Sequence, residues 1–503
     1  MSTQSSHPET VSVLDQIKQR TEHLHALRQF CDPYGSAFLI TDFIEGIHEK
    51  FSSIQGETHS QEKVRTAGRL MAVRLHGKAA FGDLVSSSSK IQIYFKQDHL
   101  GEAQWNFFEL LDMGDIIGIE GSVFRTRRGE LSILIDKITP LSKSLYPLPE
   151  KWHGLKDVEV RYRQRYLDLM VNPEVRKIFL LRSALIAKMR SFLDRRGFHE
   201  METPVMSVTA GGAEAKPFIT HHNALDLDLH LRIATELHLK RLLVGMLEKV
   251  YEIGRIFRNE GISTRHNPEF TSLELYEAYS DYEGMMKITE DLIVHLADEL
   301  IGKREIPYQG KTIQLNPPFE RITYSDALRQ FGGILLSDIR DLEKAKHAAK
   351  NLKISLDPKA HVGHYIDKIF EAVVEPNLIQ PTFILDYPIE ISPLAKRKSD
   401  DPSLTYRFEL FISNMEMANA FSELNDPFDQ KERFKAQLKL REAGDETAHS
   451  MDEDFLAALE YGMPPAGGLG IGIDRLCMLF TDSASIREVI LFPLLRPAAN
   501  EMS

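Results

Sequence analysis

The sequence has few cysteines, no long apolar run and no excess of basic residues. Its two cysteines, Cys31 and Cys477, are far apart, which excludes a disulfide scaffold or a cysteine-rich zinc site and suits a reducing compartment. No stretch approaches the ~18 uncharged apolar residues of a membrane span, and the first residues lack the basic and apolar regions of a signal peptide. We therefore expect a cytoplasmic protein without a membrane segment.

The charge balance argues against a general polyanion binder. The 503 residues include 61 Lys and Arg against 73 Asp and Glu, a formal net charge of −12, so any nucleic acid must be bound by local basic patches. Glycine and proline number only 30 and 23, too few for a low-complexity chain. The hydrophobic and charged fractions, 43% and 27%, are typical of globular domains, and the length predicts about three structural units.

The first part of the chain contains five short segments rich in Val, Ile, Phe and Tyr, separated by Gly, Ser and Asp turns. They are VRTAGRLMAVRL, KAAFGDLV, KIQIYF, DIIGIEGSVFRT and ELSILIDKI, between residues 64 and 138. Five such runs predict a small antiparallel barrel. We expect a polar, partly helical extension at 1–60, the barrel at 61–145 and a Pro-containing linker at 146–160.

The pattern changes after the linker, and residues 161–503 are predicted to form one α+β domain with an insertion at about 325–375. A long amphipathic helix begins at Pro173 and ends near Gly197. Two further amphipathic helices are predicted at 283–301 and 338–351. Strand-like runs alternate with the helices without the regular βαβ order of a doubly wound sheet, so we expect a central antiparallel sheet flanked by helices.

The segment GRIFRNEGISTRHNPEFTSLELYEAY (254–279) contains many unlike functional groups. Arg258 and Glu260 are two residues apart, so on a strand they share one face. A polar loop and a second strand add His266, Asn267, Phe270, Glu274 and Tyr276. Arginine offers a planar fork for phosphate or carboxylate, and an aromatic ring near it can stack a base. The alternative is an exposed hairpin with a solvated ion-pair network.

A second hairpin is predicted in YRFELFISNMEMANAFSELND (406–426), with a tight turn around Ser413-Asn414. Glu409 and Glu416 flank the turn, so their carboxylates come near each other and can hold Mg²⁺ beside a nucleotide. A further set shares one strand face: Asn419, Phe421 and Glu423. Because Glu416 has the opposite parity, all four can serve one pocket only if the strand contains a bulge or bend. The alternative is a surface hairpin with unpaired acids.

The segment PPAGGLGIGIDRLCMLF (464–480) is Gly-rich, then strand-like, then helical. Asp474 is placed to cap the helix, and Arg475 to project from its first turn, where a helix N-terminus favours anions. Neither the dinucleotide fingerprint nor the P-loop spacing is present. Close packing is therefore the alternative explanation of the glycines.

Glu236 interrupts the apolar stretch RIATELHLKRL. A buried carboxylate costs several kcal/mol unless it meets a cation or hydrogen bonds. Arg232 or Lys240 could pair with this carboxylate within the protein. The functional alternative is that it binds an ammonium group of a ligand.

Together these segments resemble the class II aminoacyl-tRNA synthetases, and most closely the lysyl-tRNA synthetase family, over roughly residues 60–500. FRNEGISTRHNPEF resembles the second class motif and GLGIGIDRL the third, while RYRQRYLDLM, PFITHHNALDLDLHLRIATELHLKRL and FSELND match the lysine branch. The long helix running into GFHEMETPVM resembles the first motif, which implies a homodimer formed through 175–206. The resemblance also implies an OB-fold anticodon-binding barrel, a class II catalytic domain, and ATP-dependent transfer of L-lysine to tRNA(Lys).

The resemblance assigns two catalytic groups in ATP binding. Arg258 would contact the α-phosphate and the lysine carboxylate, and Arg475 the γ-phosphate. Glu260 would hold the adenine amine and Phe270 would stack on the adenine ring. His266 and Asn267 would lie near the triphosphate. Glu409 and Glu416 would bind Mg²⁺, of which more than one ion is expected. No Ser/His/Asp or Cys/His set is needed, because activating a carboxylate with ATP requires positioning and charge stabilisation rather than a protein nucleophile.

For lysine, the resemblance implies that Gly212 and Glu236 receive the α-amino group, and that Tyr276 and Glu423 receive the side-chain ammonium. The pocket would be completed by Arg258, Glu274, Asn419 and Phe421. Because lysine has two cationic nitrogens, its site should contain an excess of carboxylates. An analogue without the terminal amine would leave a buried carboxylate unpaired, and such sites discriminate by about 10⁴ or more.

In the barrel, the resemblance places Phe81 and Gln92 where the central anticodon base is stacked and read, with Arg74 and Glu130 as neighbouring groups. Residues 1–150 contain 16 Lys and Arg against 19 Asp and Glu. Base readout and contacts from the rest of the protein must therefore carry the interaction with RNA. An ordinary barrel position is the alternative for Phe81.

Three rival interpretations stay open. A non-catalytic RNA-binding paralogue would have lost catalytic groups, a lysine-activating paralogue that modifies a protein lacks the barrel, and a sister synthetase for aspartate or asparagine would not have an acidic pocket. This sequence keeps the charged groups, the barrel and the acidic residues, which favours the lysine enzyme. It departs from some family members at Ala418 and Ala420, which replace glycine and predict a tighter pocket floor.

Overall fold

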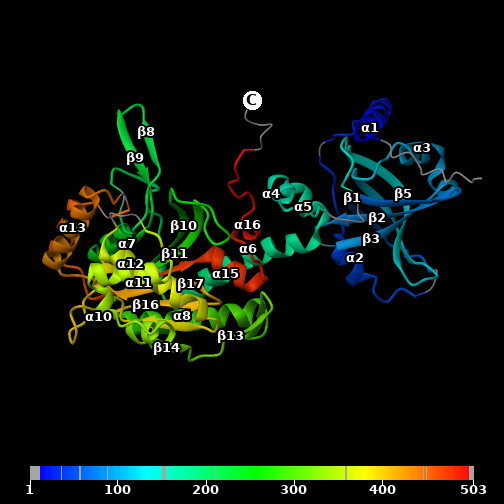
Figure 1. Ribbon diagram of the computed structural model, residues 1–503. Helices are drawn as coiled ribbons and strands as arrows, with labels where there is room; N and C mark the ends of the chain where they lie inside the picture. Colours follow the sequence, from blue (N-terminus) through cyan, green and yellow to red (C-terminus); the bar gives the residue numbers. More distant parts are fainter. Residues whose placement is uncertain are drawn as a thin grey trace, which may run out of the picture. The chain divides into compact units, whose positions relative to one another are not determined.

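The computed structural model describes residues 12–497 except 36, 56–57, 88, 150–154, 210, 357–359, 446 and 449. The chain divides into two compact units, Met1–Arg176 and Lys177–Ser503 (Figure 1). Residues 1–11 of the predicted extension and 150–154 of the predicted linker lie outside the described residues. No helix in the described part of the chain is long and apolar enough to cross a membrane.

The first unit is built around a closed five-stranded barrel with the order β1-β2-β3-β5-β4, which confirms the predicted barrel. Its strands are β1 (Lys63–His76), β2 (Ala79–Ser86), β3 (Ser89–Lys96), β4 (Ile116–Arg125) and β5 (Leu131–Ser142). β3 and β5 pair in parallel, so the expectation of a purely antiparallel barrel is wrong at this pair. Alternate strand residues such as Leu84, Ile93 and Ile119 are buried inside, together with Trp105 and Phe108 of α3 (Gln97–Glu109).

Short helices complete this unit. They are α1 (Val13–Leu27), α2 (Ile44–Lys50), α4 (Val158–Arg163) and α5 (Arg165–Val171). The long predicted helix follows as α6 (Pro173–Asp194). Proline at the first helical position is favourable because the missing N–H has no partner inside the helix there.

The second unit contains an eight-stranded sheet with the order β14-β15-β16-β17-β18-β11-β10-β6. Its strands, in that order, are Glu320–Thr323, Thr382–Leu385, Arg407–Ile412, Met415–Ser422, Ala466–Gly472, Glu269–Ala278, Lys249–Phe257 and His199–Glu200. All internal pairs are antiparallel, as expected, whereas β14 and β6 pair in parallel at the two edges. The sheet is therefore mixed, with an antiparallel centre.

The two faces of this sheet have different chemistry because successive strand residues point to opposite sides. On β11, Leu273 and Leu275 enter the main core, which also contains residues of α6, α8 (Tyr282–Leu300) and α15 (Ile473–Thr481). The even-numbered residues Phe270, Glu274 and Tyr276 are on the opposite face. The apolar face thus anchors the sheet and leaves a polar face for a site.

The remaining elements surround the sheet. They are β7 (Met206–Ser207), β8 (Ile219–His222), β9 (Leu227–Leu231), α7 (Glu236–Val244), β12 (Glu305–Tyr308), β13 (Lys311–Gln314), α9 (Tyr324–Ala327), α10 (Leu336–Ile339), α11 (Leu342–Asn351), α12 (Val362–Val373), α13 (Pro427–Glu442), α14 (Glu453–Glu460) and α16 (Ile486–Val489). Helices α9 to α12 share a smaller core that also contains Ile384 of β15 and Phe411 of β16. Figure 1 shows the β8–β9 hairpin projecting from this unit.

Candidate active site

A pocket of about 470 Å³ lies on the polar face of the large sheet. It brings together most of the residues predicted for the site. The predicted residues that line it are Gly212, Glu236, Arg258, Glu260, His266, Asn267, Phe270, Glu274, Tyr276, Glu409, Glu416, Asn419, Phe421 and Arg475. Glu423 does not line the pocket; it is buried, with 1% of its surface exposed, and its Oε1 lies against Gly468 of the pocket floor.

Arg258 and Glu260 reach the pocket from a loop. β10 ends at Phe257, so the expectation that they share a strand face is wrong. The loop is closed by a hydrogen bond from Arg258 N to Pro268 O of 2.8 Å. The Arg258 guanidinium lies over the ring of Phe270, 5.2 Å from its centroid, which is cation–π geometry.

β16 and β17 form the predicted tight hairpin. Ser413 and Asn414 both have positive φ, 50° and 63°, which is typical of a two-residue type I′ turn. Glu409 is directly opposite Asn419, but the register shifts between this pair and the turn. This is the bulge that the parity of Glu416 required. It places Glu416 on the pocket face together with Glu409 and Asn419.

The glycines of β18 lie between β17 and β11, on the floor of the pocket. A Cβ on Gly468 would overlap Glu423 Oε1 and would lie 2.5 Å from Tyr276 Cε1. A Cβ on Gly470 would have no neighbour closer than 3.8 Å. Gly468 therefore allows close packing, and the groups that pack against it are Glu423 and Tyr276 of the predicted site.

Two expectations about this region are wrong. Ala418 and Ala420 are buried in the main core and do not form the pocket floor, so they cannot tighten it. Asp474 does not cap α15; it accepts hydrogen bonds from Arg182 Nη1 at 2.7 Å and from Thr271 N at 2.6 Å. A tertiary arginine outcompetes the local cap because a charge-assisted hydrogen bond is the stronger contact.

At one end of the pocket, a single lysine lies among carboxylates. Lys240, one helical turn after Glu236 on α7, donates a hydrogen bond of 2.5 Å to Glu236 Oε1 and forms an ion pair with Glu423. Of the two internal partners considered for Glu236, Lys240 is thus the one observed, since Arg232 pairs with Glu252.

Glu274 is the third carboxylate at this end. Its Oε1 accepts a hydrogen bond of 3.2 Å from Thr235 N, and Tyr276 Oη donates to its Oε2 at 3.5 Å. Burial raises the pKa of Glu274 to about 7, with a further contribution from Glu236. Burial also raises the pKa of Glu236, and it raises that of Glu423 to about 8 in spite of Lys240. Three carboxylates and one lysine leave this end short of positive charge, which favours a ligand with ammonium groups.

Arginines dominate the other end. Arg475 Nη1 donates to Glu416 O at 2.7 Å and to Glu416 Oε2 at 3.0 Å, and its Nη2 lies 3.2 Å from His266 Nε2. Burial, then the charge of Arg475, lowers the pKa of His266, so the ring is neutral at pH 7 and its Nε2 accepts from Arg475. Arg258 Nε has no hydrogen-bond partner within the described part of the chain. Unfilled arginine donors in a buried position suit phosphate or carboxylate oxygens.

The two glutamates predicted to hold metal have different environments. Glu409 Oε1 accepts from Arg407 Nη2 and its Oε2 from Tyr387 Oη, both at 2.7 Å. Burial raises the pKa of Glu409 to about 7, because Arg407 only partly offsets the desolvation and Glu416 adds to it. For Glu416 the desolvation is outweighed by Arg475, and the pKa falls below its usual value. Glu416 is therefore ionised at neutral pH.

On the barrel, the residues predicted to contact an anticodon lie on adjacent strands. Phe81 pairs with Arg74 on β1 and with Tyr94 on β3, and its ring stacks on Tyr94 with centroids 4.5 Å apart. Gln92 is two residues before Tyr94 and accepts a hydrogen bond of 2.8 Å from Ser132. The fourth residue, Glu130, is exposed in the turn before β5. Arg74, Phe81 and Gln92 thus share a face that contains stacked aromatic rings.

Comparison with known proteins matches this architecture. Residues 157–496 match the family model described as tRNA synthetases class II (D, K and N), and residues 64–141 match the OB-fold nucleic acid binding domain. The lysine–tRNA ligases of Moorella thermoacetica and Carboxydothermus hydrogenoformans are each 57% identical to this chain, over 484 and 482 residues, and both alignments cover 96% of the chain and 98% of the relative. That of Bacillus cereus is 52% identical over 485 residues, covering 96% and 97%.

The chain belongs to the lysyl-tRNA synthetase family. This confirms the family and the fold class predicted from the sequence. The barrel found in β1–β5 is the OB-fold of the synthetase, and the large sheet with its helices is the class II domain.

Three charged residues of the synthetase pocket, Glu214, Asp367 and Arg407, were missed in the sequence. Arg407 contacts Glu409 and also donates to Asn419 Oδ1 at 3.0 Å; its position two residues before Glu409 on one strand was the available signal. Asp367 lines the pocket from α12. No signal marked it, because an acid on an amphipathic helix of an insertion is ordinary. Lys240 was considered only as a partner of Glu236, and its contact with Glu423 was not foreseen.

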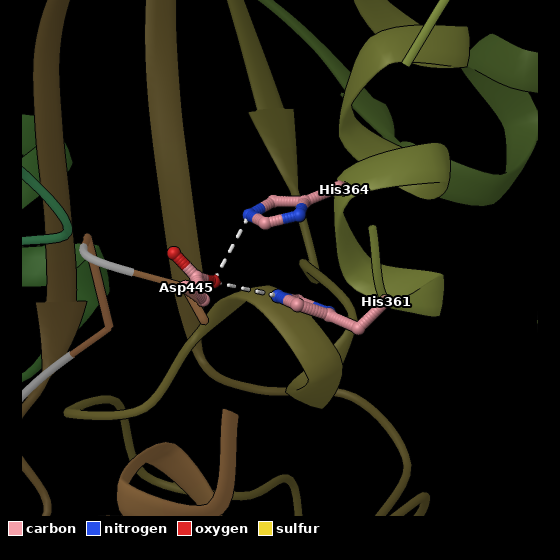
Figure 2. Close-up of side chains that lie close together, drawn as sticks. All are labelled: His361, His364 and Asp445. Atoms are coloured by element: carbon pink, nitrogen blue, oxygen red, sulfur yellow. Dashed lines mark ion pairs between the residues drawn. The ribbon is translucent and has the colours of Figure 1, made fainter. Parts of the chain in front are cut away.

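A group of possible metal ligands lies outside the synthetase pocket. His361 and His364 at the start of α12 face Asp445, which follows α13 (Figure 2). Their Nε2 atoms are 3.6 Å and 3.4 Å from Asp445 Oδ2. His361 Nδ1 accepts a hydrogen bond of 3.0 Å from Gly363 N, so the neutral ring carries its proton on Nε2. A metal ligand needs that atom unprotonated, so the arrangement favours a histidine–carboxylate contact instead.

Proposed function

We propose that the chain activates L-lysine with ATP to form lysyl-adenylate and diphosphate, and transfers lysine to the 3′ end of tRNA(Lys) with release of AMP. The observation that carries this proposal is the charge pattern of one pocket. At one end there are three buried carboxylates and one lysine, which pairs with two of them; at the other end there are two arginines, one of which lies over an aromatic ring. The first end suits an amino acid with two ammonium groups, and the second suits a nucleoside triphosphate.

In the nucleotide half, Phe270 would stack on adenine and Glu260 would hold its exocyclic amine. Arg258, which lies over the Phe270 ring, would contact both the α-phosphate and the lysine carboxylate. The carboxylate oxygen attacks the α-phosphorus and the bond to the diphosphate breaks, while Arg258 stabilises the charge on the α-phosphate. Arg475 would bind the γ-phosphate. The triphosphate would also contact His266 and Asn267.

In the lysine half, Gly212 and Glu236 would receive the α-amino group, and Tyr276 and Glu423 the side-chain ammonium. Support comes from the contact of Glu423 with Gly468, which brings its Oε1 to the pocket floor beside Tyr276. The remaining wall would be formed by Glu274, Asn419, Phe421 and Arg258. Amino acids without the terminal amine would leave Glu423 paired with Lys240 but without its hydrogen bond to the ligand.

Mg²⁺ would be held by Glu409 and Glu416 together with the phosphates of ATP, and more than one ion is expected. The residues fit this ion because the donors are oxygen atoms and because Asp367 adds a third carboxylate to the same pocket. When bound, the ions would offset the charge of the triphosphate. Arg407 and Tyr387 orient Glu409 for this role through hydrogen bonds to both of its oxygens.

The barrel would bind the anticodon. Phe81 is supported as a stacking platform by its partner ring Tyr94, and base–aromatic stacking is worth about 1–3 kcal/mol per base. Gln92 would read the base edge, with Arg74 and Glu130 beside it.

Two further expectations are part of the proposal. A homodimer through 175–206 is supported by exposed apolar side chains in that segment, such as Leu180 and Met206. A cytoplasmic location is supported by the free state of Cys31 and Cys477.

The test is aminoacylation with labelled L-lysine, ATP, Mg²⁺ and tRNA(Lys), with tRNA(Asp) plus aspartate as the parallel arm. The proposal predicts labelled lysyl-tRNA only in the first arm. Charging with aspartate would identify a sister synthetase. Formation of lysyl-adenylate without charging of tRNA would indicate an enzyme that modifies another acceptor, and either result would overturn the proposal.

A further inference from the structure

Lys240 has no assigned role, yet it connects the two carboxylates proposed to bind opposite ends of the substrate. Its side chain is fully buried, at 0% exposure. Its Nζ donates to Glu236 on the same helix, forms an ion pair with Glu423 beyond the end of β17, and lies 5.3 Å from the centroid of the Phe421 ring. A buried ammonium in this position neutralises part of the charge on both carboxylates.

Other charged groups face the same cluster. Glu274 and Tyr276 approach from β11. Besides burial, Glu274 contributes to the raised pKa of Glu423, and Glu236 and Glu423 both contribute to the raised pKa of Tyr276. Arg407 of β16 acts on Glu236 from a greater distance. Lys240 opposes the rise that burial causes in the pKa of Glu236 and Glu423, so without this internal cation both carboxyl groups would keep their protons to a higher pH.

We propose that Lys240, as a positioning residue for the amino-acid substrate, holds Glu236 and Glu423 in the orientation that receives its two amino groups and favours their ionised form. This inference rests on the proposed function. When all three carboxyl groups are ionised, they and the one internal ammonium leave two negative charges, which match the α- and side-chain ammonium groups of lysine. A monoamine of similar length would leave one carboxylate unmatched, so Lys240 also sets the preference for a diamine.

The test compares Lys240→Met with the wild type in ATP–diphosphate exchange between pH 6.5 and 9. We expect the KM for lysine at pH 7 to rise at least tenfold while the KM for ATP changes less than twofold. In both enzymes the KM for lysine should fall as the pH rises, because the carboxyl groups must lose protons before they can bind ammonium groups. In Lys240→Met this fall should occur at a pH at least one unit higher than in the wild type. Lys240→Arg, which keeps the charge, should keep the wild-type pH profile.

Two further variants make the test specific. Lys240→Gln keeps a hydrogen-bond donor and loses only the charge, so it gives the same readout if Lys240→Met does not fold. Lys143→Met is the matched control, because Lys143 is also buried, at 1% exposure, between Asp112 at 2.5 Å and Asp115 at 2.8 Å, but in the barrel. It should unfold more easily with both KM values unchanged.

Two outcomes would overturn the inference. One is a folded Lys240→Gln enzyme with the KM for lysine and pH profile of the wild type. The other is an equal rise in the KM for lysine and for ATP, which would indicate only a structural role. If the wild type shows no lysine-dependent exchange at all, it is the proposed function that fails, and the two failures are therefore distinguishable.

Discussion

Replacing Gly468 by alanine should damage the lysine half of the pocket selectively. The new Cβ would overlap Glu423 Oε1 and lie 2.5 Å from Tyr276 Cε1, so both side chains must move. Overpacking of this kind costs about 1–3 kcal/mol. If this cost falls on the contact with the substrate ammonium, the KM for lysine rises about 5- to 150-fold, since 1.4 kcal/mol is a factor of ten. The KM for ATP should stay within twofold.

The assay is ATP–diphosphate exchange with lysine or ATP varied in turn, accompanied by urea unfolding. Gly470→Ala on the same strand is the control for unfolding, because its Cβ would have no neighbour closer than 3.8 Å. We expect the free energy of unfolding to fall by about 1–3 kcal/mol for Gly468→Ala and by less than about 0.5 kcal/mol for Gly470→Ala. A folded Gly468→Ala enzyme with an unchanged KM for lysine would refute the reasoning.

The remaining predictions concern both units. The pKa values of Glu274 and Glu423 are raised to about 7 and about 8, so both carboxyl groups are largely neutral at pH 6 and ionise as the pH rises. The wild-type KM for lysine should therefore fall between pH 6 and pH 8. A KM for lysine that does not change with pH, measured from initial rates of exchange, would contradict this. Glu423→Gln should raise the KM for lysine more than tenfold while ATP binding changes little, whereas an equal loss of both would exclude Glu423 from the lysine pocket. Phe81→Ala should weaken tRNA binding by about 1–3 kcal/mol in a filter-binding assay and leave exchange unchanged; an unchanged dissociation constant would mean that Phe81 is an ordinary barrel residue.

Local patterns were sufficient to predict the barrel strands and the hairpins. The turn chemistry of Ser413-Asn414 located the β16–β17 hairpin, and the parity of Glu416 showed that a bulge was needed. The position of the bulge depends on the pairing of the two strands, which a single strand sequence does not contain. The parallel β3–β5 pair was missed for the same reason, since chain order alone does not say which strands meet.

Contacts between distant segments account for the other errors. Lys240 was one of two partners considered for Glu236, and the structure shows that ion pair, but the contact of Lys240 with Glu423 exists only because the fold brings the residue after β17 to α7. Asp474 followed the sequence rule for a helix cap, yet Arg182 of another helix takes its carboxylate. The charge pattern of the pocket is thus a property of the assembled fold, even though the sequence named most of its members.

The most direct test of the account is ATP–diphosphate exchange with Mg²⁺, screened across all twenty amino acids. The account predicts exchange with lysine alone, because only lysine combines a side chain of this length with a second ammonium group for the acidic end of the pocket. Exchange with aspartate or asparagine, or no exchange with any amino acid from folded protein, would contradict it.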